Sequence, residues 1–394
     1  EIVKGLLEPG MFFEELGFRY FGPLDGHNLD QLTENLKNIV SLPGPRVLHV
    51  VTVKGKGYSP AEQDAESFHS AGKFSVSNGD FCAKSVCTYT EAFRRHIVEC
   101  AQRDERVAVI TAAMEKGTGL DAFRERFPER FFDVGIAEQH AVSFAGGMAR
   151  QGVKPVAAIY STFLQRAYDQ LMQDVALQGF DAVLCLDRAG LVGEDGPTHH
   201  GAFDVAYMRT IPGSIVMAPG YREDLEAMLD FAIANKGLFS IRYPKDTVLE
   251  LPLKEPVQLG KAEVIEEGGG CALLALGSML KEALAAAKLL RRDGYAPIVV
   301  NARFAKPLDE EFLMRLADEA PVICVLEEGT VSGGFGDAVL EFYRSRQMLD
   351  KIRFERCAIP DEFITLGKRS LLFRQCGLDA ESIAVKVKNL LTLK

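Results

Sequence analysis

The side chains in this sequence that are best suited to chemistry come directly after short apolar segments. The set joins Glu138, an acid at a predicted helix start, to a second acid and to histidines, arginines and aromatic residues from other segments: Tyr160, Phe163, Arg166, Arg188, Asp195, His199, His200 and Arg242. Guanidinium and imidazole groups bind carboxylates and phosphates, and a carboxylate can hold a proton. Together these residue types suit a small anionic substrate.

Each of these residues also has an ordinary structural interpretation. The helix dipole favours an acid at a helix start, so Glu138 could serve only its helix. Phe163 could belong to the core, and an arginine after a strand is often an ion-pair partner. Thr198, His199 and His200 could cap a segment, since adjacent histidines seldom bind one metal ion. The gathering of so many polar groups at strand ends favours a site.

The order of the elements predicts an α/β protein. Between residues 88 and 247, apolar strands such as RVAVIT, PVAAIY and DAVLCLD alternate with helical segments such as FLQRAYDQLMQDVALQ and REDLEAMLDFAIAN. This alternation predicts parallel sheets covered by helices on both faces, with ligands beyond the carboxyl ends of the strands. We expect three blocks, 1–82, 83–250 and 251–394. The first contains a helix over 29–40 and the strand PRVLHVVTV, and ends in the polar linker FSVSNGDFCAKSV.

The composition argues against several other classes of protein. The net charge of −10 disfavours an extended nucleic-acid surface. No apolar run approaches the roughly 18 residues of a membrane-spanning helix. Eight cysteines include no CxxC pair, and Cys82 and Cys87, the two nearest in sequence, have no histidine partner, so we expect reduced thiols and no zinc site. No G-x-G-x-x-G motif follows a strand with an acid about 20 residues later, which argues against a nicotinamide-binding protein. No Walker motif is present, and no G-x-S-x-G motif of a serine hydrolase.

Several motifs, in order along nearly the whole chain, closely resemble the 1-deoxy-D-xylulose-5-phosphate synthase family of thiamine diphosphate-dependent, transketolase-like enzymes. They are YFGPLDGHN, KGKGYSPAEQD, FFDVGIAEQHAVSFAGGMA, IYSTFLQRAYDQ, DRAGLVGEDGPTHHGAFD and IRYPK. The resemblance implies a thiamine diphosphate-binding fold. It makes residues 1–82 the C-terminal remnant of a diphosphate-binding domain, 83–250 a pyrimidine-binding domain and 251–394 a transketolase C-terminal-like domain.

The resemblance also implies an activity. Pyruvate would condense with D-glyceraldehyde 3-phosphate, with loss of CO2, to give 1-deoxy-D-xylulose 5-phosphate for isoprenoid, thiamine and pyridoxal biosynthesis. Thiamine diphosphate and Mg2+ would be the cofactors and a homodimer the assembly. We expect a bacterial cytoplasmic enzyme, or a plastid one if a transit peptide preceded the chain, with neither nucleic acid nor membrane as a partner.

Roles for individual residues follow from the same resemblance. Glu138 would hydrogen-bond the N1′ atom of the cofactor's aminopyrimidine, and Phe163 would stack on that ring, with Ile136 also at the cofactor. The pocket around the reactive carbon and the donor substrate would be lined by His27, Tyr160, Arg166, Asp195 and His199. Arg188 and Arg242 would hold the acceptor's phosphate. His140 is expected to pack or orient, and the roles of His69 and His200 stay open.

One departure from the family pattern is large. The GDG…N motif, whose Asp and Asn bind Mg2+, is not found, and neither are two histidines expected upstream of Glu1. We therefore expect no metal ligand within these residues and place the Mg2+ ligands in an N-terminal part. Proteolysis, a truncated chain or a naturally split enzyme would each explain this.

Three other functions stay open. The chain could be a transketolase half-subunit, a dehydrogenase β-type subunit or a non-catalytic fragment that completes a dimer. The segments STFLQRAYDQ and DGPTHHGAFD favour the synthase, because the broader family shares only the DVxIAEQH pattern.

Overall fold

A computed structural model of the chain describes residues 10–69, 71–81 and 86–392. The chain forms two compact units, Glu1–Ser85 and Val86–Lys394. Within the first unit, the described residues form a short parallel sheet of two strands and three helices: α2 (Met11–Glu15), β1 (Arg19–Asp25), α3 (Leu29–Val40), β2 (Arg46–Val51) and α4 (Ser59–Gln63). The predicted helix over 29–40 is confirmed, and the Asn28 side chain caps it by accepting a hydrogen bond from the Gln31 amide at 3.1 Å.

The described residues of the first unit bury little apolar surface. Strand β2, predicted from its apolar run to be covered on both faces, is half-buried in its interior and exposed at its ends. Phe12, Leu29 and Val40 are 69, 70 and 72% exposed. The apolar run therefore indicates the strand correctly, but the described residues of this unit do not provide its cover.

Part of the predicted polar linker is ordered rather than extended. Phe74 and Phe81 form an antiparallel bridge, and the Ser75 amide donates to the Asp80 carbonyl at 2.8 Å. The two phenylalanine rings pack on Phe68, and the three rings form a small aromatic cluster. Residues 82–85 of the linker, including Cys82, lie outside the described residues.

The second unit contains a seven-stranded sheet in the order β12-β7-β8-β6-β5-β3-β4. All of its neighbouring strands are parallel except β12 and β7, which are antiparallel. The strands are β3 (Val107–Thr111), β4 (Phe131–Asp133), β5 (Lys154–Tyr160), β6 (Ala182–Asp187), β7 (Ile215–Met217), β8 (Leu238–Arg242) and β12 (Phe304–Lys306). The expected parallel α/β sheet is confirmed.

Helices cover both faces of this sheet. Val109 and Val183 pack with α5 (Tyr89–Arg103), α6 (Asp121–Arg126) and α11 (Arg222–Ala234). The neighbouring residues Ile110 and Leu184 point to the other face and pack with α7 (Glu138–Arg150) and α10 (Asp204–Thr210). Because side chains alternate along a strand, a sheet covered on both faces needs the continuous apolar runs that the sequence shows.

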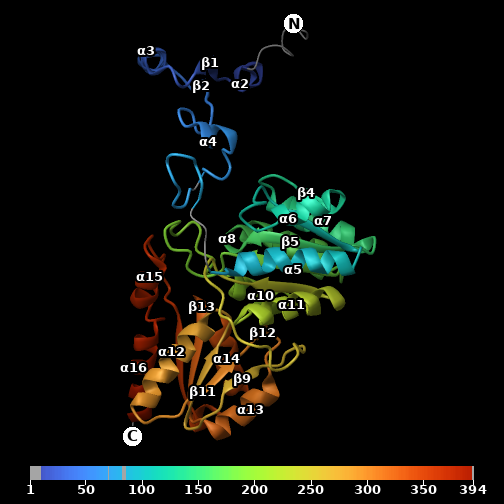
Figure 1. The fold of residues 1–394 in the computed structure, drawn as a ribbon, viewed down its shortest axis with the longest axis vertical. Coiled ribbons are helices and arrows are strands. Elements are labelled where there is room, and N and C mark those ends of the chain that lie inside the picture. Colours follow the sequence, from blue (N-terminus) through green and yellow to red (C-terminus); the bar gives the residue numbers. More distant parts are fainter. Residues whose placement is uncertain (1–9, 70, 82–85, 393–394) are drawn as a thin grey trace. The chain divides into compact units, whose positions relative to one another are not determined.

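A second sheet of five strands follows in the order β14-β13-β10-β11-β9, with only β9 antiparallel to its neighbour. Figure 1 shows α12 and α16 on one side of it and α13 and α14 on the other. The elements are β9 (Glu263–Glu266), β10 (Cys271–Ala275), α12 (Met279–Arg292), β11 (Ile298–Asn301), α13 (Glu310–Glu319), β13 (Val322–Thr330), α14 (Phe335–Ser345), β14 (Arg353–Ile359), α15 (Arg369–Cys376) and α16 (Ala380–Thr392).

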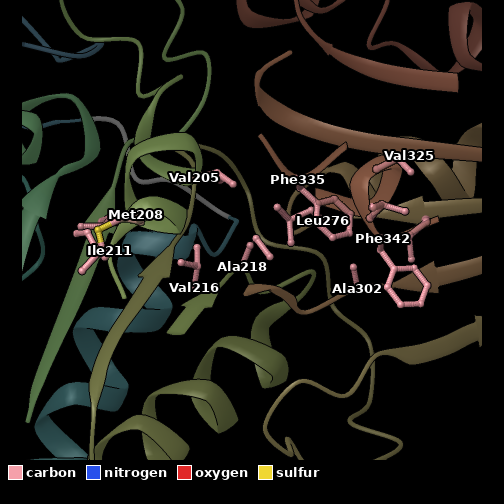
Figure 2. Packing of buried hydrophobic residues seen from close by; sticks show 14 of the residues in the cluster. Val205, Met208, Ile211, Val216, Ala218, Leu276, Ala302, Val325, Phe335 and Phe342 are labelled. Carbon is pink, nitrogen blue, oxygen red and sulfur yellow. The ribbon is translucent and has the colours of Figure 1, made fainter. Parts of the chain in front are cut away.

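The two sheets share one hydrophobic cluster. Figure 2 shows its side chains running from Met208 and Ile211, through Ala218 and Leu276, to Phe335 and neighbouring residues of the second sheet. Strand β12 crosses the same boundary, because it follows β11 in sequence but pairs with β7. The division into blocks at residue 250 stays a prediction, and the packing across it is continuous.

The segment predicted as one helix over 163–178 is broken. It consists of α8 (Ser161–Leu164), a 3-10 turn (Gln165–Ala167), α9 (Tyr168–Gln170) and a π-helix (Leu171–Ala176). Apolar spacing alone does not distinguish these from a regular helix, and π-type turns often occur near functional sites. Among the described residues, no helix combines the length and apolar character needed to cross a bilayer, and the seven described cysteines form no disulfide.

We predict that Phe335→Ala lowers the free energy of unfolding by about 3–5 kcal/mol, because it leaves a cavity in the cluster between the sheets. Phe335 is 1% exposed, whereas Phe363, the matched control, is 81% exposed. Phe363→Ala should therefore change stability by less than about 0.5 kcal/mol in urea unfolding. Equal losses for the two variants would contradict the shared core.

Candidate active site

The site forms at the carboxyl edge of the seven-stranded sheet. Tyr160, Asp187 and Arg242 are the last residues of β5, β6 and β8, which are adjacent parallel strands. Glu138 begins α7, after the loop that follows β4. Because parallel strands end at the same edge, residues far apart in sequence reach one surface.

Glu138 is a buried carboxylate with an unsatisfied oxygen. The residue is 2% exposed, and its Oε2 atom lies 3.1 Å from Nη1 of Arg166, whose side chain is half exposed. Oε2 nevertheless accepts no hydrogen bond from any described residue. The N-terminus of α7 favours the negative charge, but a buried oxygen without a donor is costly, so this atom is suited to a donor from a ligand.

Three aromatic rings pack together beside the strand ends. Tyr160 and Phe163 lie nearly parallel, with centroids 5.5 Å apart and an interplanar angle of 12°. The ring of His199 meets Phe163 edge-on at 5.4 Å. The Nδ1 atom of His199 is 2.9 Å from Oγ1 of Thr198, which leaves Nε2 as the ring nitrogen for another partner.

Arg188 is held against Tyr160 from several sides. Its Cζ lies 3.9 Å from the centroid of the Tyr160 ring, and its Nη1 donates to the Gly117 carbonyl at 2.6 Å. The same Nη1 is 3.0 Å from Oδ1 of Asp187, while Thr90 donates its hydroxyl to Oδ2 of Asp187 at 2.7 Å. The Arg188 backbone has a φ of 60°, so this loop is bent sharply to place the side chain.

Burial controls the protonation of two groups in this cluster. Burial raises the pKa of the Tyr160 phenol, so Tyr160 is a neutral hydrogen-bond donor at physiological pH. Burial also raises the pKa of Asp187, and the charge of Arg188 and the hydroxyl of Thr90 oppose that shift. Gly117 has a packing role here, because a Cβ atom at this position would lie 2.2 Å from the Tyr160 hydroxyl.

Arg242 is more deeply buried than a residue whose only role is to bind a phosphate. The residue is 4% exposed, and its Nε donates to Oδ2 of Asp204 at 2.7 Å. Its Nη2 donates to the carbonyls of Glu328 at 2.9 Å and Gly201 at 3.4 Å. Nη1 makes no hydrogen bond to a described residue, so its two N–H groups are the ones left for a ligand.

Asp195 and Ile136 face solvent within the second unit. Asp195 forms an ion pair with Lys245, with 2.9 Å between Oδ2 and Nζ, and Ile136 is 77% exposed. The loop that carries Asp195 is closed at its ends, because Gly190 and Gly201 exchange backbone hydrogen bonds of 2.7 and 2.8 Å. The closed loop keeps Asp195 and His199 beside the strand ends.

His27 and His69 belong to the first unit and are described within that unit. The Nε2 atom of His27 accepts a hydrogen bond from the Val53 amide at 2.8 Å. The amide of His69 donates to the Glu66 carbonyl at 3.1 Å. Their part in the site stays a prediction.

Two further histidines singled out in the sequence, His140 and His200, have structural contacts. His140 stacks on Phe144 at 5.8 Å and 11°, in line with the expected packing role. His200 is 5% exposed, accepts a hydrogen bond from the Val192 amide at 3.1 Å and lies 3.3 Å from the Thr365 carbonyl. His200 therefore anchors the loop rather than facing a ligand.

Sequence reasoning missed the residues that support the site. Asp187 and Asp204 lie within the quoted motifs DRAG and GAFD, where an acid at a strand end or a helix start was a usable signal. Thr90, Gly117 and Glu328 gave no such signal, because they come from distant segments that only the fold brings close.

Comparison with known proteins gives this architecture a class. Family models match residues 85–249 as a transketolase pyrimidine-binding domain, 260–383 as a transketolase C-terminal domain and 1–52 as a 1-deoxy-D-xylulose-5-phosphate synthase domain. A solved split-gene transketolase, described as an inactive β4 tetramer, is 30% identical with a TM-score of 0.70, over 78% of this chain and 99% of that chain. The chain belongs to the transketolase-like family of thiamine diphosphate-dependent enzymes.

Within that family, the chain is similar to 1-deoxy-D-xylulose-5-phosphate synthases. The synthase of Aquifex aeolicus is 45% identical over 99% of this chain and 62% of the relative. The synthase of Symbiobacterium thermophilum is 48% identical over 99% of this chain and 60% of the relative. The chain thus spans three-fifths of the length of these relatives. A transketolase from Pichia stipitis, 17% identical with a TM-score of 0.64, shares the fold.

We predict that Arg242→Ala lowers the free energy of unfolding by about 3–5 kcal/mol, because it leaves the Asp204 carboxylate buried without its partner. As a control, Arg346→Ala removes an ion pair with Glu310 whose side chains are 53 and 58% exposed. That change should cost no more than about 1 kcal/mol. A stability loss for Arg242→Ala as small as that of the control would argue against the structural part of its role.

Proposed function

We propose that this chain is the part of a 1-deoxy-D-xylulose-5-phosphate synthase that holds the pyrimidine end of thiamine diphosphate and both substrates. The observation that carries the proposal is the buried Glu138 carboxylate, whose Oε2 atom has no hydrogen-bond donor among the described residues. A ring nitrogen that carries a proton would satisfy it. The identities of 45 and 48% to curated synthases support the same function.

The residues around Glu138 fit the cofactor's pyrimidine. The half-buried ring of Phe163 is positioned by Tyr160 on one side and by His199 at its edge, which suits an aromatic ligand. Ile136 is an exposed apolar residue on the loop before Glu138, available to cover the same ligand. When bound, thiamine diphosphate supplies the electron sink for loss of CO2 from pyruvate and for addition to the aldehyde.

The chain's own groups would bind the substrates and control protons. Glu138 holds a proton at the pyrimidine nitrogen, and Arg166, half exposed beside it, binds the donor's carboxylate. Tyr160 as a neutral phenol and His199 through Nε2 orient the reacting oxygen atoms. Asp195 contributes from the closed loop once Lys245 is displaced, and His27 stays a proposed substrate-binding residue of the full-length enzyme.

Arg188 and Arg242 would bind the phosphate of glyceraldehyde 3-phosphate. Arg188 supplies a guanidinium that Tyr160 and Asp187 hold in place, and Arg242 supplies the two N–H groups of Nη1. Two fixed guanidinium groups at one sheet edge favour a dianionic phosphate over an uncharged aldehyde. The Mg2+ ligands and the diphosphate site are proposed to lie in the remaining part of the full-length enzyme, which we propose to be a homodimer. A bacterial cytoplasmic location stays a prediction.

A transketolase half-subunit is the second candidate, because the split-gene transketolase is covered over 99% of its length. Its identity of 30% is well below the 45% of the Aquifex aeolicus synthase. The donor substrate separates the two functions. In the full-length protein, the synthase releases CO2 from pyruvate in the presence of glyceraldehyde 3-phosphate, whereas a transketolase uses a ketose phosphate without CO2 release.

We predict that Glu138→Gln in the full-length enzyme lowers kcat by about 10²–10⁴-fold, because a neutral amide cannot hold the proton at the pyrimidine nitrogen. CO2 release from pyruvate measures the loss, and calorimetry checks that thiamine diphosphate still binds. Glu129→Gln, at an exposed position of the same unit, serves as the control and should keep full activity. A Glu138→Gln enzyme with normal turnover would refute the assignment.

We also predict that Arg188→Ala raises the KM for glyceraldehyde 3-phosphate by about 10–100-fold, because it removes charge-assisted hydrogen bonds to the phosphate. Steady-state kinetics with unphosphorylated glyceraldehyde supplies the internal control, since that aldehyde has no phosphate to lose. If both aldehydes were affected equally, Arg188 would act on the fold or the donor and not on the phosphate.

A further inference from the structure

A group of metal-binding side chains lies outside the site described above. His96 and Cys100 are four residues apart on α5, so they share one face of that helix, and Asp230 reaches them from α11. One ligand atom from each of the three residues lies within 4.8 Å of the other two. The proposed function uses none of these residues.

The His96 side chain lies against Asp230, which also contacts Cys100. His96 is 9% exposed, and its Nε2 is 3.0 Å from Oδ1 of Asp230 but makes no hydrogen bond to a described residue. The Cys100 thiol donates to the same Oδ1 at 3.4 Å. On the other side of the ring, Nδ1 lies 3.3 Å from a carboxylate oxygen of Glu99, an arrangement that orients metal-binding histidines in many proteins.

We propose that Nε2 of His96, Sγ of Cys100 and a carboxylate oxygen of Asp230 bind Zn2+, with Glu99 orienting His96. One nitrogen, one sulfur and one oxygen ligand, with a water molecule as the fourth, form a set typical of zinc. Mg2+ and Ca2+ prefer oxygen ligands alone, so the thiolate selects against them. In the sequence only the four-residue spacing of His96 and Cys100 points to this site, because Asp230 is far from both in the chain.

The charges at the site are consistent with a bound dication. The thiolate and the carboxylate would carry two negative charges, which Zn2+ would neutralise. In the structure, Nη2 of Arg103 supplies positive charge instead, at 2.6 Å from Oδ1 of Asp230 and 3.5 Å from Sγ of Cys100. The Arg103 side chain is 58% exposed, so it can move into solvent when a metal ion enters.

A metal ion bound here would also connect two elements of the second unit. Bound Zn2+ would link α5 to α11, the two helices that pack together on one face of the seven-stranded sheet.

Titration of the full chain with Co2+, in an excess of Mg2+, tests the proposal. Co2+ takes the place of Zn2+, and its bond to a thiolate gives a charge-transfer absorption band. We expect this band to reach its maximum at one equivalent of Co2+ per chain and to disappear when Zn2+ is added. Cys100→Ser should abolish it, and Cys87→Ser, the control at a nearby thiol outside the cluster, should retain it. A band that persists in Cys100→Ser, or no band in the unaltered chain, would overturn the proposal.

Two exposed positions keep the test independent of folding. Asp230→Ala, at a side chain 42% exposed, removes a proposed ligand, so it should weaken binding at least as much as the roughly 10–100-fold that loss of an outer-shell partner costs. Arg103→Ala should tighten it by about tenfold, because the competing guanidinium is removed. If Arg103→Ala left the affinity unchanged or weaker, the cluster would be an ordinary ion-pair network and the metal site would be rejected.

Discussion

The ion pair between Arg242 and Asp204 connects the parts of the molecule that the candidate active site needs. Arg242 ends β8, Asp204 begins α10, and the same guanidinium donates to the Glu328 carbonyl in the second sheet. One buried cation therefore joins two sheets and the end of the loop that carries His199. Because removing either partner leaves an uncompensated buried charge, these segments are held in one arrangement.

The second sheet acts on the site through Glu328. Its Oε1 accepts a hydrogen bond from the Leu191 amide at 2.7 Å, at the start of the loop, and its Oε2 accepts from Ser278 at 2.8 Å. A Cβ atom at Gly190 would lie 2.3 Å from the Glu328 carboxylate. The C-terminal block thus contributes no predicted site residue, yet it fixes the loop that presents two of them, Asp195 and His199.

Sequence patterns were sufficient for features that depend on local periodicity. The helix over Leu29–Val40 and the gathering of Glu138, Tyr160 and Arg242 at strand ends follow from apolar spacing and from the geometry of parallel sheets. The broken segment after Tyr160 was missed, because its apolar spacing matches a regular helix. The burial of Arg242 was missed as well, since its partner Asp204 and the Glu328 carbonyl become neighbours only through the fold.

The crossing of β12 also limits how the chain can be divided. Phe304 and Lys306 pair with Met217 and Val216 at the edge of the seven-stranded sheet. These two β12 residues belong to the region 260–383, which matches the transketolase C-terminal domain. A chain cut near residue 250 would expose β7 as an unpaired edge, which is a template for aggregation. A functional division of the chain between the two blocks would therefore need another segment to take the place of β12 beside β7.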